Sequence, residues 1–223
     1  SRMGSKRLPG KSLYLIDDLP LVILAARRAG NQGGKVVVLT SDDDSDDILA
    51  DTLESFGVEC FRGNLNNVLS RFVSAGRYYG LHHSDIVVRL TADNLVPDGT
   101  LINEVVNRFR NLHSSFGHIG PDYPTDGLPY GVSVEAFYFG ALESSLKSTS
   151  DSFDSEHVTP WMKNEFGTVG LASSFPLNQL RDLSHLRLTI DTIDDFEYMS
   201  ELFKKVENKV GVLWSDLCSL ADG

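Results

Sequence analysis

The chain has 223 residues, and its 41% hydrophobic and 23% charged content is typical of a folded globular protein. The formal net charge of −11 disfavours a broad basic surface for duplex nucleic acid, and no apolar run approaches the ~20 residues of a membrane span. Cys60 and Cys218 are too few for a disulfide framework or a cysteine-rich metal site, and no signal peptide opens the chain. We therefore expect a cytoplasmic protein with neither nucleic acid nor membrane partners.

A basic, glycine-containing segment opens this otherwise acidic chain. Its cations are Arg2, Lys6, Arg7 and Lys11. Gly4 and Gly10 let the backbone approach a ligand closely, and the hydroxyl of Ser5 adds a donor suited to phosphate oxygens. The two glycines stand one residue too far apart for a P-loop, and the strand-like run 13–16 follows where a helix should begin. The alternatives are a solvated basic terminus and a cloning scar over residues 1–5.

The next hundred residues alternate between short apolar runs and longer helical patterns. Helices are predicted over Pro20–Ala29, Asp42–Phe56, Asn67–Tyr79 and Thr100–His113, and strands over Lys35–Thr40, Val58–Arg62 and Asp85–Leu90. This alternation predicts an α/β, Rossmann-like fold with a mostly parallel sheet flanked by helices. Ligands of such sheets bind beyond the carboxyl ends of the strands. A buried strand usually precedes a loop like residues 2–12, so we expect a first strand that this chain lacks.

The second half of the chain is less regular. A functional loop is predicted over Ser114–Pro129, strands over Gly131–Phe139, Val169–Ser174 and Leu186–Ile190, a short helix from Gly140, and helices over Glu156–Phe166 and Ile193–Lys209. There is no internal repeat or linker. We expect one domain over residues 1–223, with a small arm inserted at about 114–179.

Two aspartates stand at the predicted carboxyl ends of strands. Asp93 follows the apolar run 86–88, and Asp191 ends the run 188–190. Two carboxylates delivered to one sheet edge are a plausible Mg²⁺ site, because this ion takes oxygen ligands from one or two carboxylates plus phosphates. The alternative for each is the N-cap of a following helix, and Thr192 beside Asp191 strengthens that alternative.

Other chemically suggestive residues carry weaker signals. The acidic run 42–47 is more typical of a solvated helix start than of a metal site. His82 and His83 are adjacent and make poor paired ligands. Glu135 lies on an apolar strand, where a buried carboxylate is costly unless it is paired. The alternative is that Glu135 occupies an exposed position in a strand that alternates between buried and exposed residues.

Residues 2–13 resemble the nucleotide-binding signature of the cytidylyltransferases that make CMP-activated acidic sugars. Acylneuraminate and 3-deoxy-manno-octulosonate cytidylyltransferases belong to this family, and the resemblance is nearest to its spore coat polysaccharide biosynthesis protein F branch. Further segments that resemble the family follow in the expected order: Leu39–Asp42, Phe61–Gly63 with Val68–Phe72, Val88–Asn94, Gly131–Glu135, Glu156–Pro160 and Leu186–Thr192. The resemblance therefore covers nearly the whole chain.

The resemblance implies a fold of the nucleotide-diphospho-sugar transferase type, a homodimer formed through the arm, and a Mg²⁺-dependent enzyme. Such an enzyme transfers CMP from CTP to a 2-keto-3-deoxy sugar acid or nonulosonic acid and releases pyrophosphate, for surface polysaccharide or glycan biosynthesis. The implied catalytic residues are Arg2, Lys11, Asp93 and Asp191, the last two also holding the metal. The implied nucleotide contacts are Arg2, Gly4, Ser5, Lys6, Arg7, Lys11, Thr40, Ser41, Asp42, Arg62, Arg71 and Thr91. The implied acceptor contacts are Glu135, His157 and Arg187. For His157 and Arg187 two roles stay open, a contact with the sugar carboxylate and a hydrogen bond within the core.

The chain departs from the family pattern at four positions. Relatives usually carry an acid at Asn67, aspartate at Ser133, arginine at Ser155 and proline at Leu95. These positions cluster on the acceptor side, so the resemblance supports CTP more strongly than any named sugar. The alternatives are a related sugar-nucleotide glycosyltransferase and an inactive homologue that binds nucleotide only.

Overall fold

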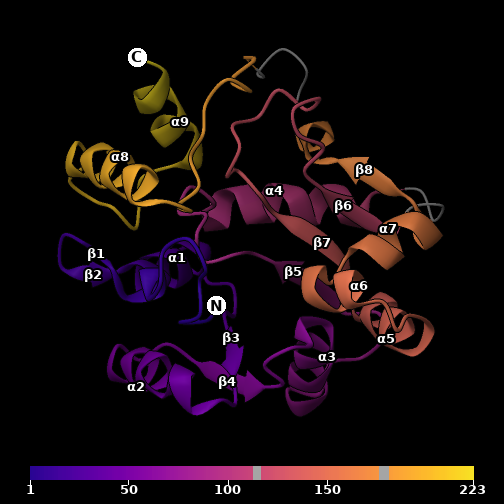
Figure 1. Ribbon diagram of the computed structural model, residues 1–223. Helices are drawn as coiled ribbons and strands as arrows, with labels where there is room; N and C mark the ends of the chain where they lie inside the picture. The colour runs from indigo at the N-terminus through magenta and orange to yellow at the C-terminus, as the bar shows by residue number, and fades with distance from the viewer. Residues whose placement is uncertain (113–116, 176–180) are drawn as a thin grey trace.

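A computed structural model describes residues 1–112, 117–175 and 181–223 and is shown in Figure 1. The elements of its first half are 3-10 turns Lys11–Leu13 and Asp44–Asp46, strands β1 (Leu15–Ile16), β2 (Leu19–Pro20), β3 (Val38–Ser41), β4 (Cys60–Gly63) and β5 (Ile86–Arg89), and helices α1 (Leu21–Ala29), α2 (Asp47–Ser55), α3 (Val68–Tyr78) and α4 (Gly99–Arg110). Those of its second half are β6 (His118–Gly120), β7 (Glu135–Tyr138), α5 (Phe139–Ser148), α6 (Ser152–His157), α7 (Pro160–Phe166), β8 (Thr168–Gly170), a 3-10 turn Leu171–Ser174, α8 (Ile193–Lys204) and α9 (Trp214–Asp222).

The strands form one short hairpin, one parallel pair and one mixed sheet. β1 pairs with β2 in the hairpin, β3 is parallel to β4, and the sheet has the order β5-β7-β6-β8. Within it β6 is parallel to β8, whereas β7 is antiparallel to both β5 and β6. The α/β class is therefore confirmed, and the described sheet is mixed because β7 returns beside β6 without a crossover helix.

Several predicted elements differ in detail from those of the structure. Residues 186–190 form only isolated bridges, Asn94 to Thr189 and Tyr130 to Arg187, rather than a full strand. The helix predicted over 156–166 divides into α6 and α7, because Val158 has a left-handed φ of 74° and a proline begins α7.

The remaining differences concern element ends and elements that had no clear pattern. The helix predicted to reach residue 209 ends at Lys204, β8 is followed by a 3-10 turn, and β6 and α9 were not predicted. Residues 113–116, within a predicted helix end and loop, and 176–180, at the end of the expected arm, lie outside the described residues.

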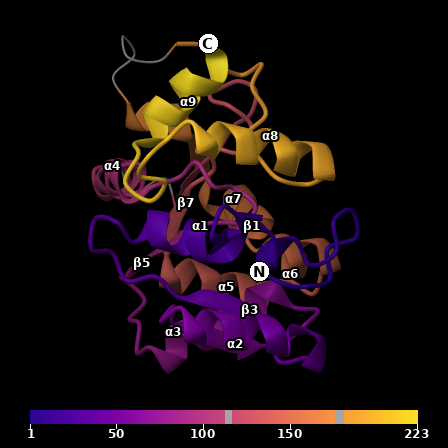
Figure 2. The same ribbon diagram turned by 90° about the vertical axis from the view of Figure 1, so that its left-hand side faces the viewer.

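Three apolar clusters hold the layers together. The largest lies between the sheet, α1, α4, α8 and α9, a second joins β7 to α3, α5 and α7, and a third packs α1 against α2. Figure 2 shows the two C-terminal helices at one end of the molecule and α2 and α3 at the other, with α1 between them. In the part of the chain that the structure describes, no helix is long and apolar enough to cross a bilayer.

A fully buried arginine, Arg28, connects the C-terminal segment to the chain that follows β5. Its guanidinium donates to the carbonyl oxygens of Leu95 and Val96 at 2.6 and 2.8 Å. It also donates to those of Lys209 and Val212 at 2.7 and 2.9 Å. Burial lowers the pKa of Arg28 to about 10, so it stays charged at neutral pH. Arg28, which lies on α1, thereby fixes the turn that follows Asp93.

Replacing Arg28 should destabilise the fold strongly. Arg28→Met leaves four carbonyl groups without their donor, and each unsatisfied group costs about 1–3 kcal/mol. We expect the free energy of unfolding, measured in urea, to fall by at least about 3 kcal/mol. The matched control is Arg27→Met at the adjacent exposed position, which should change it by less than about 1 kcal/mol. Equal effects of the two variants would contradict this role.

Candidate active site

The basic loop, residues 2–11, folds back on itself beside the carboxyl end of β3. The amides of Ser5 and Gly10 both donate to the carbonyl oxygen of Met3, at 2.9 and 3.0 Å. Gly10 has φ 72°, a left-handed conformation that favours glycine, and it immediately precedes the 3-10 turn that carries Lys11. The loop therefore has a defined shape that directs Lys11 toward the ends of the neighbouring strands.

Asp46 anchors this loop to β3. Its side chain is buried and accepts hydrogen bonds from Met3 N at 2.7 Å, Thr40 Oγ1 at 3.0 Å and Ser41 N at 3.1 Å, and another from Ser41 Oγ. Burial alone would raise the pKa of Asp46, but these donors outweigh it and leave the pKa below its usual value. Thr40 and Ser41, two predicted nucleotide contacts, are buried and bound to this carboxylate. The third, Asp42, is exposed.

Lys11 joins the two predicted metal ligands. Its Nζ lies 2.8 Å from Asp93 Oδ2, 2.6 Å from the carbonyl oxygen of Ile190 and 3.4 Å from Asp191 Oδ1. Burial alone would raise the pKa of Asp93. The charge and hydrogen bond of Lys11, with further hydrogen bonds, outweigh burial and leave the pKa of Asp93 below its usual value. One cation thus spans two carboxylates that are 98 residues apart in the sequence.

Neither carboxylate takes the alternative role of a helix cap. The N-cap of α4 is Asp98, whose side chain accepts from Leu101 N at 2.8 Å. The N-cap of α8 is Thr192, which forms a capping box with Asp195. The two carboxylates are therefore available for other contacts, and Asp191 also pairs with Arg7 at 2.7 Å.

The remaining predicted nucleotide contacts differ in how many hydrogen bonds and ion pairs they form with the rest of the protein. Arg2 donates to Leu65 O at 3.1 Å and pairs with Glu156 at 3.7 Å. Arg62 donates to Ser41 O and pairs with Asp47, and Arg71 is buried and donates to Asn64 O and Leu65 O. Ser5 Oγ accepts from Leu8 N, and Thr91 Oγ1 accepts from Asn94. Gly4 has open space beside its Cα, and Lys6 is exposed.

Glu135, the first predicted acceptor contact, lies in a buried ionic group. We call the residues Arg89, His118, Glu135, Thr159 and Lys163 the Glu135 cluster. The carboxylate binds Arg89 through Oε2, and its Oε1 lies 2.9 Å from Thr159 Oγ1, 2.8 Å from Lys163 Nζ and 3.3 Å from His118 Nε2. The sequence alone left its partners undetermined.

The other two predicted acceptor contacts have different surroundings. His157 is exposed, with its ring 4.3 Å from that of Phe153. Arg187 pairs with Asp191 at 2.8 Å and Asp195 at 3.1 Å, and its guanidinium lies over the Tyr130 ring. Within the described residues, no hydrogen bond or ion pair joins Glu135, His157 and Arg187 to one another.

Three residues that the sequence analysis did not single out contribute to these contacts. Asp46 was treated only as part of an acidic run, and Arg89 and Lys163 were not considered. For Arg89 a signal existed, since a cation inside an apolar run predicts a buried anionic partner. Lys163 on α7 carried no comparable signal.

The donor set around Lys11 fits a divalent ion. Asp93 and Asp191 already share one cation. The Oδ1 of Asn94, which follows Asp93 in the chain, is buried with no hydrogen-bond partner among the described residues. Those residues contain no group of three or more acidic, histidine or cysteine side chains placed to hold a metal. An ion here would take the two carboxylates and complete its shell with phosphate oxygens or water.

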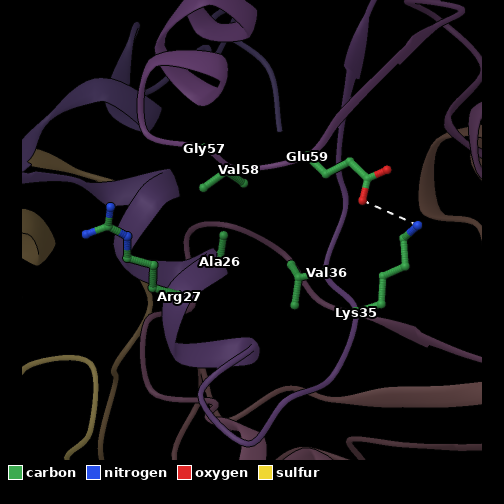
Figure 3. A pocket seen from close by; sticks show the side chains of 7 residues that line it. All are labelled: Ala26, Arg27, Lys35, Val36, Gly57, Val58 and Glu59. Carbon is green, nitrogen blue, oxygen red and sulfur yellow. Dashed lines mark ion pairs between the residues drawn. The ribbon is translucent and has the colours of Figure 1, made fainter.

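A pocket of about 310 Å³ lies away from this centre (Figure 3). It is lined by Ala26, Arg27, Lys35, Val36, Gly57, Val58 and Glu59, and Lys35 pairs with Glu59 across one side at 3.4 Å. Lys35 and Val36 precede β3, and residues 57–59 precede β4, so the pocket lies between α1 and the amino ends of these two strands. Lys11 instead contacts Asp93, four residues beyond the carboxyl end of β5, together with Ile190 and Asp191.

Comparisons with known proteins agree on one family. The family model described as cytidylyltransferase matches residues 1–217. The uncharacterized protein MJ1063 of Methanocaldococcus jannaschii is 32% identical over 208 residues, covering 92% of this chain and 81% of the relative. The spore coat polysaccharide biosynthesis protein SpsF of Bacillus subtilis is 28% identical over 228 residues, with coverages of 99% and 90%.

Two solved structures are similar in fold. A cytidylyltransferase from Leptospira borgpetersenii superposes with a TM-score of 0.86 at 28% identity, over 99% of this chain and 90% of the other. A CMP:2-keto-3-deoxy-manno-octonic acid synthetase, solved in complex with CTP, superposes with a TM-score of 0.62 at 15% identity, with coverages of 92% and 96%. The second similarity shows the shared fold.

Asp46 should contribute stability that depends on pH. Its pKa is lower in the folded protein than its usual value of 3.8, so the contribution is complete above that value and is lost as the pH falls below it. We expect Asp46→Asn to lower the free energy of unfolding by about 1–3 kcal/mol at pH 7, and the difference from wild type to shrink below about pH 4. Urea unfolding between pH 7 and 3 measures it, with the exposed Asp51→Asn as control. A difference that does not change with pH would contradict this.

Proposed function

This chain belongs to the cytidylyltransferase family and is a CTP-dependent nucleotidyltransferase, and from that premise we propose that its acceptor is an acidic sugar. A hydroxyl oxygen of the acceptor attacks the α-phosphorus of CTP, the bond to the β-phosphate breaks, and pyrophosphate leaves as the acceptor loses its proton. The acceptor class is a 2-keto-3-deoxy sugar acid or a nonulosonic acid. The observation that most directly supports transfer from CTP is that Arg7 and Lys11 of the basic loop pair with Asp191, and that Lys11 also pairs with Asp93.

The charges of the loop suit a triphosphate. Lys11 and Arg7 both pair with Asp191, and Lys11 also pairs with Asp93, so the two carboxylates balance the charges of these two cations. A triphosphate brings more negative charge than these carboxylates and offers stronger charge-assisted hydrogen bonds. We infer that Lys11 and Arg7 move from the carboxylates to phosphate oxygens when CTP binds. Arg2 and the exposed Lys6 add two further cations on the same loop.

Asp93 and Asp191, released by this exchange, would hold Mg²⁺. The bound ion would neutralise charge on the triphosphate and favour deprotonation of the acceptor hydroxyl. The chain itself orients the reactants: Asp46 and Gly10 fix the loop, and Arg28 fixes the turn that follows Asp93. Positioning of this kind contributes a large part of the rate in transfer reactions.

The biological setting that we propose follows from the relatives. SpsF of Bacillus subtilis is named for spore coat polysaccharide biosynthesis, which supports a role in surface polysaccharide or glycan biosynthesis. We propose a cytoplasmic, single-domain homodimer whose partner contacts come from the arm at about 114–179. In its described part, this segment contributes β6, β7 and β8 to the same sheet as β5.

The first test of the proposal is the reaction itself. Purified protein with CTP, Mg²⁺ and a panel of sugar acids, including 3-deoxy-manno-octulosonate and N-acetylneuraminate, should release pyrophosphate with at least one acceptor. Asp93→Asn should lower kcat by about 100-fold or more, because the site loses one of two carboxylates. The control Asp51→Asn, an exposed position on α2, should retain wild-type rates. Pyrophosphate release with none of the acids, or CMP release from a preformed CMP-sugar instead, would contradict the proposal.

The exchange of Lys11 has a separate readout that does not require turnover. In Lys11→Met no ammonium competes for the two carboxylates, so Mn²⁺ titrated without nucleotide should bind at least about 3-fold more tightly than to wild type, by electron paramagnetic resonance. The KM for CTP should rise about 10- to 100-fold, since a charge-assisted hydrogen bond to phosphate is lost. Lys147→Met, at an exposed position on α5, is the control. Unchanged or weaker Mn²⁺ binding in Lys11→Met would rule out the exchange.

A further inference from the structure

The Glu135 cluster carries more positive charge than its structural role requires. Glu135 is ionised, because His118, Arg89 and Lys163 hold its pKa well below the usual range although burial alone would raise it. Burial lowers the pKa of His118, so its imidazole is neutral at pH 7. One carboxylate therefore faces two permanent cations, Arg89 and Lys163, and the cluster keeps a net charge of about +1. A purely structural ion pair would need only one of them.

The two cations reach solvent while their shared anion does not. The Glu135 side chain is 4% exposed, whereas the side chains of Arg89 and Lys163 are 18% and 30% exposed. Among the described residues, Glu135 is the only anionic partner of either cation. Arg89 uses Nη1 for it, so Nε and Nη2 remain as donors, and the Lys163 ammonium has donors left as well. Donors of this kind on two adjacent cations suit an incoming carboxylate.

Two short chain segments connect the Glu135 cluster to the Asp93 turn and to the basic loop. Arg89 ends β5, and Asp93 follows four residues later, so at most about 14 Å of extended chain separates them. On the other side, Thr159 follows Glu156 by three residues, and Glu156 pairs with Arg2 of the basic loop. Glu156 lies on α6, Thr159 is the N-cap of α7, and Lys163 lies on α7, which Figure 1 shows directly after α6. The cluster is thus linked through two separate segments to the residues that surround Lys11.

The register of the sheet places Arg89 on the same face as Glu135. Arg89 and Glu135 are direct partners across the antiparallel ladder of β5 and β7, so their side chains lie on the same face. Phe137, two residues after Glu135 and on that face, packs in the apolar cluster of α3, α5 and α7. The Glu135 cluster is therefore bounded on one side by this apolar packing and on another by α7, which carries Lys163.

We propose that Arg89 and Lys163 bind the carboxylate of the acidic sugar acceptor, and that Glu135 is a positioning residue that holds both cations in place. This inference rests on the proposed function and deepens it by assigning the part of the site that distinguishes an acidic sugar from a neutral one. It differs from the roles implied by the resemblance, because both Glu135 oxygens are already bonded within the cluster and Arg187 is paired with Asp191 and Asp195.

The main test uses Lys163→Gln, because Lys163 is the most exposed member of the cluster and its loss should not prevent folding. With a sugar acid that the wild-type protein converts, the KM for the acid should rise about 10- to 100-fold, while kcat and the KM for CTP stay within about twofold. Lys163→Arg, which keeps the charge, should recover most of the affinity. Lys205→Gln, at the exposed end of α8, is the control and should behave as wild type.

A second measurement tests the chemistry that is recognised. Wild-type protein should convert the sugar acid with a kcat/KM at least about 10-fold above that of its carboxamide, and Lys163→Gln should reduce this ratio severalfold. Glu135→Gln should impair acid recognition and lower the thermal midpoint together, as expected of a positioning residue. A Lys163→Gln variant that loses thermal stability but keeps its acceptor KM and its preference for the acid would show a structural role and overturn the inference.

The outcomes also separate this inference from the function on which it rests. If wild-type protein releases pyrophosphate with a sugar acid and Lys163→Gln is unchanged, the inference fails and the proposed function stands. If wild-type protein releases none with any acid while still binding CTP, both fail.

Discussion

The arrangement of the whole site depends on one ammonium group. Lys11 Nζ is held by Asp93, Asp191 and the carbonyl oxygen of Ile190, which belong to two distant parts of the chain. A lone buried cation or a lone pair of carboxylates would be costly in a protein interior, but together they offset each other's desolvation. This contact joins the basic loop to the turn that follows β5 and to Asp191, and the Lys11 ammonium helps to hold the pKa of Asp93 below its usual value.

Two buried charged residues, Asp46 and Arg28, hold the two segments that meet at Lys11. Asp46 holds the basic loop through Met3 N, whereas Arg28 holds the turn after Asp93 through two carbonyl groups. Both are charged residues buried away from solvent. Arg28 donates to four backbone carbonyl oxygens, and Asp46 accepts from the backbone amides of Met3 and Ser41 as well as from two hydroxyl groups. The loop and the turn lack regular secondary structure of their own, so buried side chains replace the hydrogen bonds that a helix or sheet would supply.

Much of this could be predicted from the sequence because the relevant signals are local. The helices and strands up to α4 follow apolar periodicity. Asp93 and Asp191 could be expected together because each follows a short apolar run, and Lys11 contacts both although residues 186–190 form only isolated bridges. The features that could not be predicted from the sequence depend on contacts between residues far apart in the chain. The β7 register, the partners of Glu135 and the role of Asp46 each depend on residues brought together only by folding. A split helix at Val158 depends on one left-handed residue, which no periodicity reveals.

The segment from Asp93 to Asp98 has a consequence for how members of this family can differ in length. The Asp93 carbonyl oxygen accepts from Ile190 N, the next carbonyls of the segment bind Arg28, and Asp98 accepts from both Leu101 N and Trp214 N. The carbonyl oxygens of Asp93, Leu95 and Val96 and the side chain of Asp98 therefore all bond to distant parts of the chain. An insertion or deletion here would break several of those ties at once, so homologues should conserve its number of residues even where they do not conserve its side chains.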